Sequence, residues 1–135
     1  MKKEELLQGI QAGKYDEMLV KLYGQEALTA QKQRYSQAVE KFATLYPERG
    51  DMEVFSAPGR TEVCGNHTDH QHGKVLAAAI NLDAVAVVGF HEDGVIRLHS
   101  EGYPAITVEL SDLAINEAEH GTTKALIRGM AAQFV

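Results

Sequence analysis

The chain has 135 residues, 44% hydrophobic and 24% charged, with a formal net charge of −6 and a pI near 5.5. This balance predicts a folded globular protein and disfavours a nucleic-acid partner, because binding phosphates needs basic residues. No apolar run reaches the roughly 18 residues of a membrane span, so no membrane partner is expected. Cys64 is the only cysteine, which excludes an intrachain disulfide and favours a reducing, cytoplasmic location.

Residues 1–50 are predicted to form a helical arm. Apolar residues recur at helical spacing in two short sets, Leu6 to Ile10 and Met18 to Tyr23, and Asp16 is placed to cap the second helix. Thr29 is expected to cap a longer helix that Pro47 ends, because proline disfavours helical geometry at the residue before it. The apolar face of this helix is expected to pack on the protein's own sheet rather than on a partner.

Strands are expected on both sides of a polar central stretch. Glu53 to Ala57 is predicted to enter that stretch as a strand. Val75 to Ile80 and Leu82 to Phe90 then form nearly continuous apolar runs, which is typical of strands covered on both faces.

The remainder of the chain is expected to hold a hairpin, another strand and a helix. Asp93-Gly94 favours a tight turn between strand-like runs, and Val95 to His99 alternates as a half-buried strand does. One more strand is expected over Ile106 to Leu110. Thr122 or Thr123 is placed to cap a last helix.

The polar chemistry is concentrated between Ser56 and Gly73. Arg60 lies at the start of a glycine-bracketed turn, where a forked cation can address a phosphate or a developing oxyanion; the simpler interpretation is a surface arginine. Asp69 beside Asn66 and His67 offers the donors and acceptors that grip the vicinal hydroxyls of a polyol. A carboxylate that merely holds the turn is the alternative for Asp69.

A metal site is the other interpretation of this stretch. His67, Asp69, His70 and His72 carry ligand atoms that zinc accepts. They lie in what is expected to be irregular backbone, so a shared face is not assured. We therefore predict no metal ligand here, and a metal-dependent hydrolase stays an alternative function.

The order Pro58-Gly59-Arg60, four residues, Gly65, one residue and His67-Thr68-Asp69 resembles the first signature of the galactokinases, in the GHMP kinase superfamily. The resemblance extends from about Thr29 to Val135. This chain departs from the family pattern at three positions: it has Asn66 for glutamate, Glu62 for asparagine and His70 for tyrosine.

The resemblance implies an α+β fold, the GHMP-kinase N-terminal domain of ribosomal-protein-S5-like architecture, with a mixed sheet packed against helices. Residues 51–135 would form this domain, truncated before the ATP phosphate-binding loop. Arg60 would be catalytic and would stabilise charge near the sugar's anomeric oxygen. The sugar would be bound by neighbouring residues of the loop: Asn66, His67, Thr68 and Asp69.

The resemblance further implies a parent enzyme that transfers the ATP γ-phosphate to the anomeric hydroxyl of galactose, with ATP and Mg2+ held by residues beyond this chain. The chain alone is expected to be inactive, and its expected partner is galactose or a close relative. The alternative is a non-catalytic galactokinase homologue that binds or senses the sugar.

Overall fold

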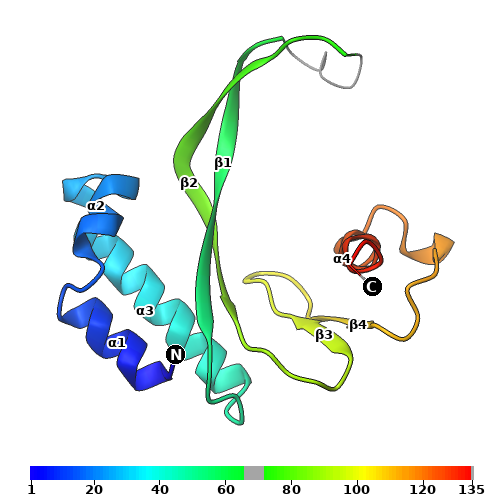
Figure 1. Cartoon of the computed structure of the whole chain (residues 1–135), viewed down its shortest axis with the longest axis horizontal. Helices are drawn as coiled ribbons and strands as arrows, with labels where there is room; N and C mark the ends of the chain where they lie inside the picture. The colour runs from blue at the N-terminus through cyan, green and yellow to red at the C-terminus, as the bar shows by residue number, and fades with distance from the viewer. Residues whose placement is uncertain (66–71, 135) are drawn as a thin grey trace. The chain divides into compact units, whose positions relative to one another are not determined.

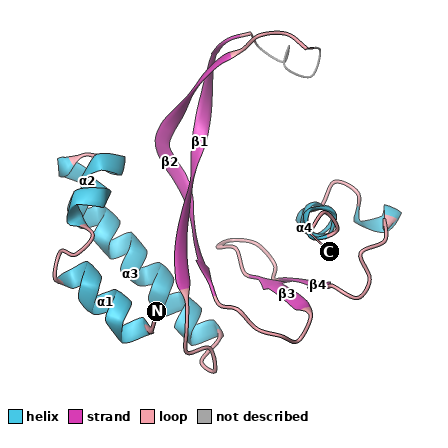
Figure 2. Cartoon of the chain, viewed as in Figure 1, coloured by secondary structure: helices cyan, strands magenta, loops and turns pink. Residues whose placement is uncertain are grey.

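The computed structural model of the protein describes residues 1–65 and 72–134, and the chain divides into two compact units, Met1–Phe90 and His91–Val135. The first unit contains the helices α1 (Lys3–Gln11), α2 (Asp16–Tyr23) and α3 (Leu28–Leu45), the 3-10 turn η1 (Gln25–Ala27), and the strands β1 (Glu53–Cys64) and β2 (Leu76–Val88) (Figures 1 and 2). The second unit contains the strands β3 (Val95–Leu98) and β4 (Ile106–Glu109), the 3-10 turn η3 (Glu117–Glu119) and the helix α4 (Thr123–Ala131).

The helical arm forms as predicted, but both of its predicted caps are wrong. The residue before α2 is Tyr15, and Asp16 lies inside the first turn, where it forms an ion pair with Lys32 at 2.9 Å. The turn η1 runs directly into α3, so helical geometry begins before Thr29 and the N-cap position falls on Ala27. The end of α3 at Leu45, just before Pro47, is as predicted.

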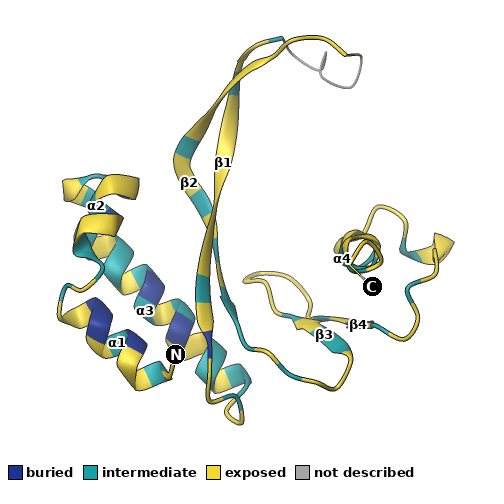
Figure 3. Ribbon diagram, in the orientation of Figure 1, coloured by how far each residue is buried: buried dark blue, intermediate teal, exposed yellow. Residues whose placement is uncertain are grey.

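Two clusters of buried apolar side chains join the helices to the β1–β2 hairpin. Figure 3 colours the buried residues of the helices dark blue. Val54 on β1 packs against both clusters, and β2 adds Val85 to the first and Val87 to the second. The apolar face of the arm therefore packs on the chain's own strands, as expected. The buried members are Ile10, Leu19, Tyr23 and Tyr35 in the first cluster, and Leu6, Val39 and Met52 in the second.

The hairpin is longer and more exposed than predicted. The two apolar runs between Val75 and Phe90 form the single strand β2, which pairs antiparallel with β1. The expectation that both faces of these runs are covered is wrong for the described residues, because Leu76 and Leu82 of β2 remain 58% and 71% exposed. The helices cover only the face that carries Val54, Val85 and Val87.

In the second unit β3 pairs antiparallel with β4, not with the strand before it. The predicted hairpin at Asp93-Gly94 is therefore wrong, although Gly94 does have the positive φ of +71° expected for a turn. The Asp93 carboxylate accepts a hydrogen bond from the Val95 amide and pairs with Arg97 at 2.6 Å. The described strands thus form two separate antiparallel pairs, and the expected mixed sheet is not found among them.

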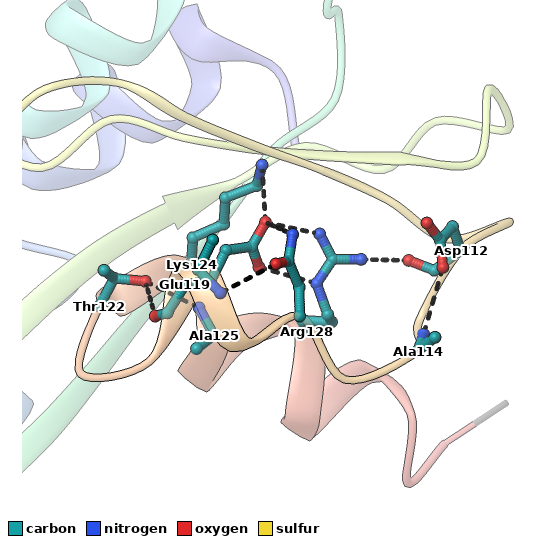
Figure 4. A network of polar contacts seen from close by, with 9 residues as sticks. Asp112, Ala114, Glu119, Thr122, Lys124, Ala125 and Arg128 are labelled. Atoms are coloured by element: carbon teal, nitrogen blue, oxygen red, sulfur yellow. Dashed lines mark hydrogen bonds and ion pairs between the residues drawn. The ribbon is translucent and has the colours of Figure 1, made fainter.

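The helix α4 is held by a polar network on the turn that precedes it (Figure 4). Thr122 is its N-cap, as one of the two predicted choices, and its hydroxyl accepts a hydrogen bond from the Ala125 amide. Arg128 donates to both carboxylate oxygens of Glu119 at 2.9 Å and also to the carbonyl of Asp112. Lys124 pairs with the same carboxylate at 3.0 Å.

This network predicts a pH dependence. The hydrogen bonds from Arg128, then those from Lys124, lower the pKa of Glu119 from 4.5 to about 2. A depressed carboxyl pKa stabilises the fold above pH 4.5, and this contribution is lost as the pH falls towards 2. In a carboxyl-carbon NMR titration, Arg128→Leu should raise the midpoint of Glu119 more than Lys124→Gln does. Equal midpoints in wild type and Arg128→Leu would contradict the assignment.

No helix in the described part of the chain has the length and apolar character needed to cross a membrane.

Candidate functional site

The structure places Arg60 on β1, exposed, opposite Ala79 of β2. The predicted sugar-binding residues, Asn66, His67, Thr68 and Asp69, lie outside the described residues. The strands that lead into and out of this segment are described, and their pairing extends to Cys64 and Leu76. Arg60 therefore lies on the strand that leads directly into the predicted binding segment.

Gly65 closes the described end of the hairpin. Its φ is +92°, a conformation that side chains with a Cβ rarely adopt. A Cβ at this position would lie 2.5 Å from the carbonyl oxygen of Lys74 and 2.8 Å from the Cα of Val75. Both contacts are with backbone, so the two strands approach each other here too closely for any residue but glycine.

The pairing of the hairpin is irregular immediately before Arg60. Pro58 pairs with Asp83 and Arg60 with Ala79, so a β2 segment from Ile80 to Leu82 faces Gly59 alone. This is a bulge of β2, and bulges redirect the side chains near them. A Cβ on Gly59 would lie 3.2 Å from both the Ile80 side chain and the Leu82 carbonyl oxygen.

A polar cluster that the sequence analysis missed lies beside this bulge. The Asp83 side chain is only 4% exposed. Its carboxylate accepts hydrogen bonds from Arg34 of α3 at 2.6 Å, Tyr23 of α2 at 2.6 Å and Ser56 of β1 at 2.5 Å. Arg34 also donates to the Asp83 carbonyl at 2.8 Å. The available signal was a lone aspartate inside an apolar run, because a buried charge requires partners.

The charges of this cluster are fixed at neutral pH. Burial opposes ionisation of Asp83, but the hydrogen bonds from Ser56, Tyr23 and Arg34 outweigh it and hold its pKa below the ordinary value. Burial raises the pKa of Tyr23, and the hydrogen bond it donates to Asp83 raises it further. The hydrogen bond to Asp83 also raises the pKa of Arg34. The cluster therefore consists of a carboxylate, a guanidinium and a neutral phenol.

A cavity of ≈ 140 Å³ adjoins the cluster. Small-molecule sites usually have roughly 300 to 1,000 Å³, so this cavity is too small to be the sugar site by itself. Its polar lining is Asp83, Tyr23, Ser56 and Asn81, beside the apolar side chains of Leu22, Pro58 and Ile80.

Within the described ranges no group of three His, Cys, Asp or Glu residues is arranged to hold a metal ion. The metal hypothesis also depended on His67, Asp69 and His70, which lie outside these ranges. His72 is described, exposed, with a φ of 60°.

Comparison with known proteins finds similarity to one family, centred on the β1–β2 hairpin. Residues 40–90 match the family model described as the galactokinase galactose-binding signature. This chain is related to the galactokinases. The galactokinase signature covers the end of α3, both strands of the hairpin and the predicted site residues.

Individual galactokinases match over longer stretches. The enzyme of Lactococcus lactis is 34% identical over 86 residues, which is 64% of this chain and 22% of the relative. That of Streptomyces coelicolor is 43% identical over 77 residues, or 56% of this chain and 20% of the relative. That of Candida parapsilosis is 34% identical over 98 residues, or 70% of this chain and 19% of the relative. The chain thus spans about a fifth of the length of these galactokinases. No solved structure matches it.

Proposed function

We propose that this chain is the sugar-binding part of a galactokinase that transfers the γ-phosphate of ATP to the anomeric hydroxyl of galactose. The observation that carries the proposal is the match of residues 40–90 to the galactose-binding signature, which includes Arg60 and Asp69. In this proposal residues 1–50 are a helical arm and residues 51–135 belong to the N-terminal sugar-kinase domain. The proposed location is the cytoplasm, in keeping with the exposed free thiol of Cys64.

Arg60 is assigned the catalytic role. Phosphoryl transfer depends on positioning and on electrostatic stabilisation of the transferred group. An exposed guanidinium on β1 is free to approach a ligand, and its fork of N–H donors suits charged oxygens. Asp69 and His67 are assigned to the sugar hydroxyls, with Asn66 and Thr68 beside them.

ATP and Mg2+ are proposed for the complete enzyme, but the described residues do not fit them. Among residues 1–65 and 72–134, no three His, Cys, Asp or Glu residues are arranged to hold a metal ion. The sequence likewise contains no glycine-rich loop that leads into a helix and cradles phosphates. We therefore assign no step through ATP to this chain, and we expect the chain alone to be inactive as a kinase.

Substitutions in the full-length protein test these assignments. Arg60→Ala should lower kcat for galactose phosphorylation by about 100- to 1,000-fold, the usual cost of losing one donor to transition-state charge. Asp69→Ala should instead raise the KM for galactose by about 10- to 100-fold, because hydrogen bonds to a charged group contribute roughly 1.5–3 kcal/mol. Steady-state kinetics with purified variants separates the two effects.

Arg49→Ala is the matched control, because Arg49 pairs with Glu48 and lies outside the proposed site. It should leave both constants unchanged. If Arg60→Ala and Asp69→Ala both behave like this control, the assignment of the site is wrong.

A second candidate function is a non-catalytic sugar sensor. It is favoured by Asn66, which removes the charge of the family's glutamate but keeps an acceptor and adds donors. A sensor would bind galactose without producing ADP, so turnover of galactose with ATP by the full-length protein discriminates the two. If the protein prefers another sugar, Asn66→Glu should shift the preference towards galactose.

A further inference from the structure

The polar cluster around Asp83 lies at the pairing position of Pro58, two residues before the proposed catalytic Arg60 on β1. Side chains alternate along a strand, so Ser56, Pro58 and Arg60 share one face of β1. Ser56 donates to the Asp83 carboxylate, and Pro58 pairs directly with Asp83. Arg60 is the next residue on this face, immediately beyond the bulge.

The hairpin by itself fixes the bulge weakly. The part of β2 that pairs beyond the bulge is a run of alanines, and Ala77, Ala78 and Ala79 are all exposed. Register is poorly specified where small, exposed side chains pair, and a slip of one residue turns every side chain to the other face. Contacts other than the pairing of the strand segments beyond the bulge must therefore hold Arg60 in register.

Several hydrogen bonds from the helices converge on Asp83, beside the bulge. Arg34 binds both its carboxylate and its backbone carbonyl, which fixes the strand as well as the side chain. Tyr23 donates to the carboxylate and is itself hydrogen-bonded to Tyr35 at 2.8 Å. These donors come from α2 and α3, two helices packed in the buried core, so Asp83 is tied to the buried core of the first unit.

We propose that Asp83 is a positioning residue for Arg60: through Arg34, Tyr23 and Ser56 it fixes the β-bulge that sets where the Arg60 guanidinium points. This proposal rests on the proposed function of Arg60 and gives the helical arm a role in it. Asp83 itself does not touch the substrate.

The first test is a double-mutant cycle in the full-length protein. Asp83→Asn should lower kcat for galactose phosphorylation by about 10- to 100-fold, because misplacement of a catalytic group by about 1 Å has an effect of this size. In an Arg60→Ala background the same change should lower kcat less than about twofold, since the group it positions is already gone. Ser56→Ala, a milder change, should show the same coupling with a smaller amplitude.

Val39→Ala is the control for a purely structural role. Val39 is fully buried in the other apolar cluster and makes none of the contacts to Asp83. It should lower the melting temperature but leave kcat unchanged in both backgrounds. Equal losses of kcat from Asp83→Asn with and without Arg60 would overturn the proposal.

The second test uses the 135-residue chain and needs no activity. In 15N NMR spectra, Asp83→Asn should shift the amides of Gly59 and Arg60 and speed hydrogen exchange across the bulge, whereas Val39→Ala should not. Unchanged amides at Gly59 and Arg60 would refute the positioning role. A full-length wild type that phosphorylates no sugar would instead refute the proposed function, and the NMR result would then decide the role of Asp83 in the bulge alone.

Discussion

Gly65→Ala is expected to weaken galactose binding by about tenfold or more and to destabilise the end of the β1–β2 hairpin. The positive φ of Gly65 alone costs an alanine roughly 1–2 kcal/mol. The added Cβ would also meet the backbone of Lys74 and Val75 at 2.5 and 2.8 Å, so the strands must separate. Because the proposed sugar ligands begin at the next residue, this separation should displace them.

Isothermal titration of galactose, with thermal unfolding of the same samples, measures both effects. Gly102→Ala is the matched control: Gly102 has a comparable φ of +79°, but a Cβ there meets nothing within 4 Å. The control should show a modest loss of stability and no change in binding. If Gly65→Ala binds galactose as the wild type does, the hairpin end does not shape the sugar site.

Local sequence signals predicted the helical arm well. Apolar residues at helical spacing marked α1, α2 and α3, and proline marked the end of α3. The cap predictions failed because neither helix begins at a short polar residue: the preceding turns place Tyr15 and Ala27 at the N-cap positions. At α3 that turn was η1, which the sequence pattern did not indicate.

Strand pairing was the part that local patterns did not predict. An apolar run such as Val75 to Phe90 has the same appearance whether one face is covered or both, so it was divided wrongly and its burial overestimated. The chain bends at Asp93-Gly94 without forming the predicted hairpin, because β3 pairs with β4, which follows it in the sequence. The described strands therefore agree with an α+β fold and differ from the predicted mixed sheet.

The candidate site likewise contains residues that the local sequence indicates and residues that only the tertiary structure brings together. Arg60 was proposed from its glycine-bracketed position and from the resemblance of this stretch to the galactokinase signature, and its role stays a prediction. The predicted turn at Arg60 is wrong, because Arg60 lies within the strand β1. Asp83, Tyr23 and Arg34 were missed because they come from β2, α2 and α3 and meet only in the folded unit. A motif search finds residues that are close in sequence, whereas the hydrogen bonds around Asp83 join residues that are distant in sequence and meet only in the tertiary structure.

Leu19→Ala is expected to destabilise the first unit by about 3 kcal/mol. Leu19 is 1% exposed and packs in the cluster formed with Ile10, Tyr23 and Tyr35. A Leu→Ala change in such a place loses the transfer free energy of the side chain and leaves a cavity, which together cost roughly 2–5 kcal/mol. Denaturant unfolding followed by far-UV circular dichroism measures the loss.

Leu22→Ala on the same helix is the control, because Leu22 is 46% exposed and the same atoms are removed mostly from solvent. It should cost about 0.5 kcal/mol or less. Tyr23 belongs to the cluster that Leu19 supports, so Leu19→Ala should also weaken the hydrogen bond from Tyr23 to Asp83. Equal losses of unfolding free energy from the two leucine variants would mean that α2 is not anchored through its buried face. The hydrogen bond from Tyr23 would then not tie Asp83 to a packed helix.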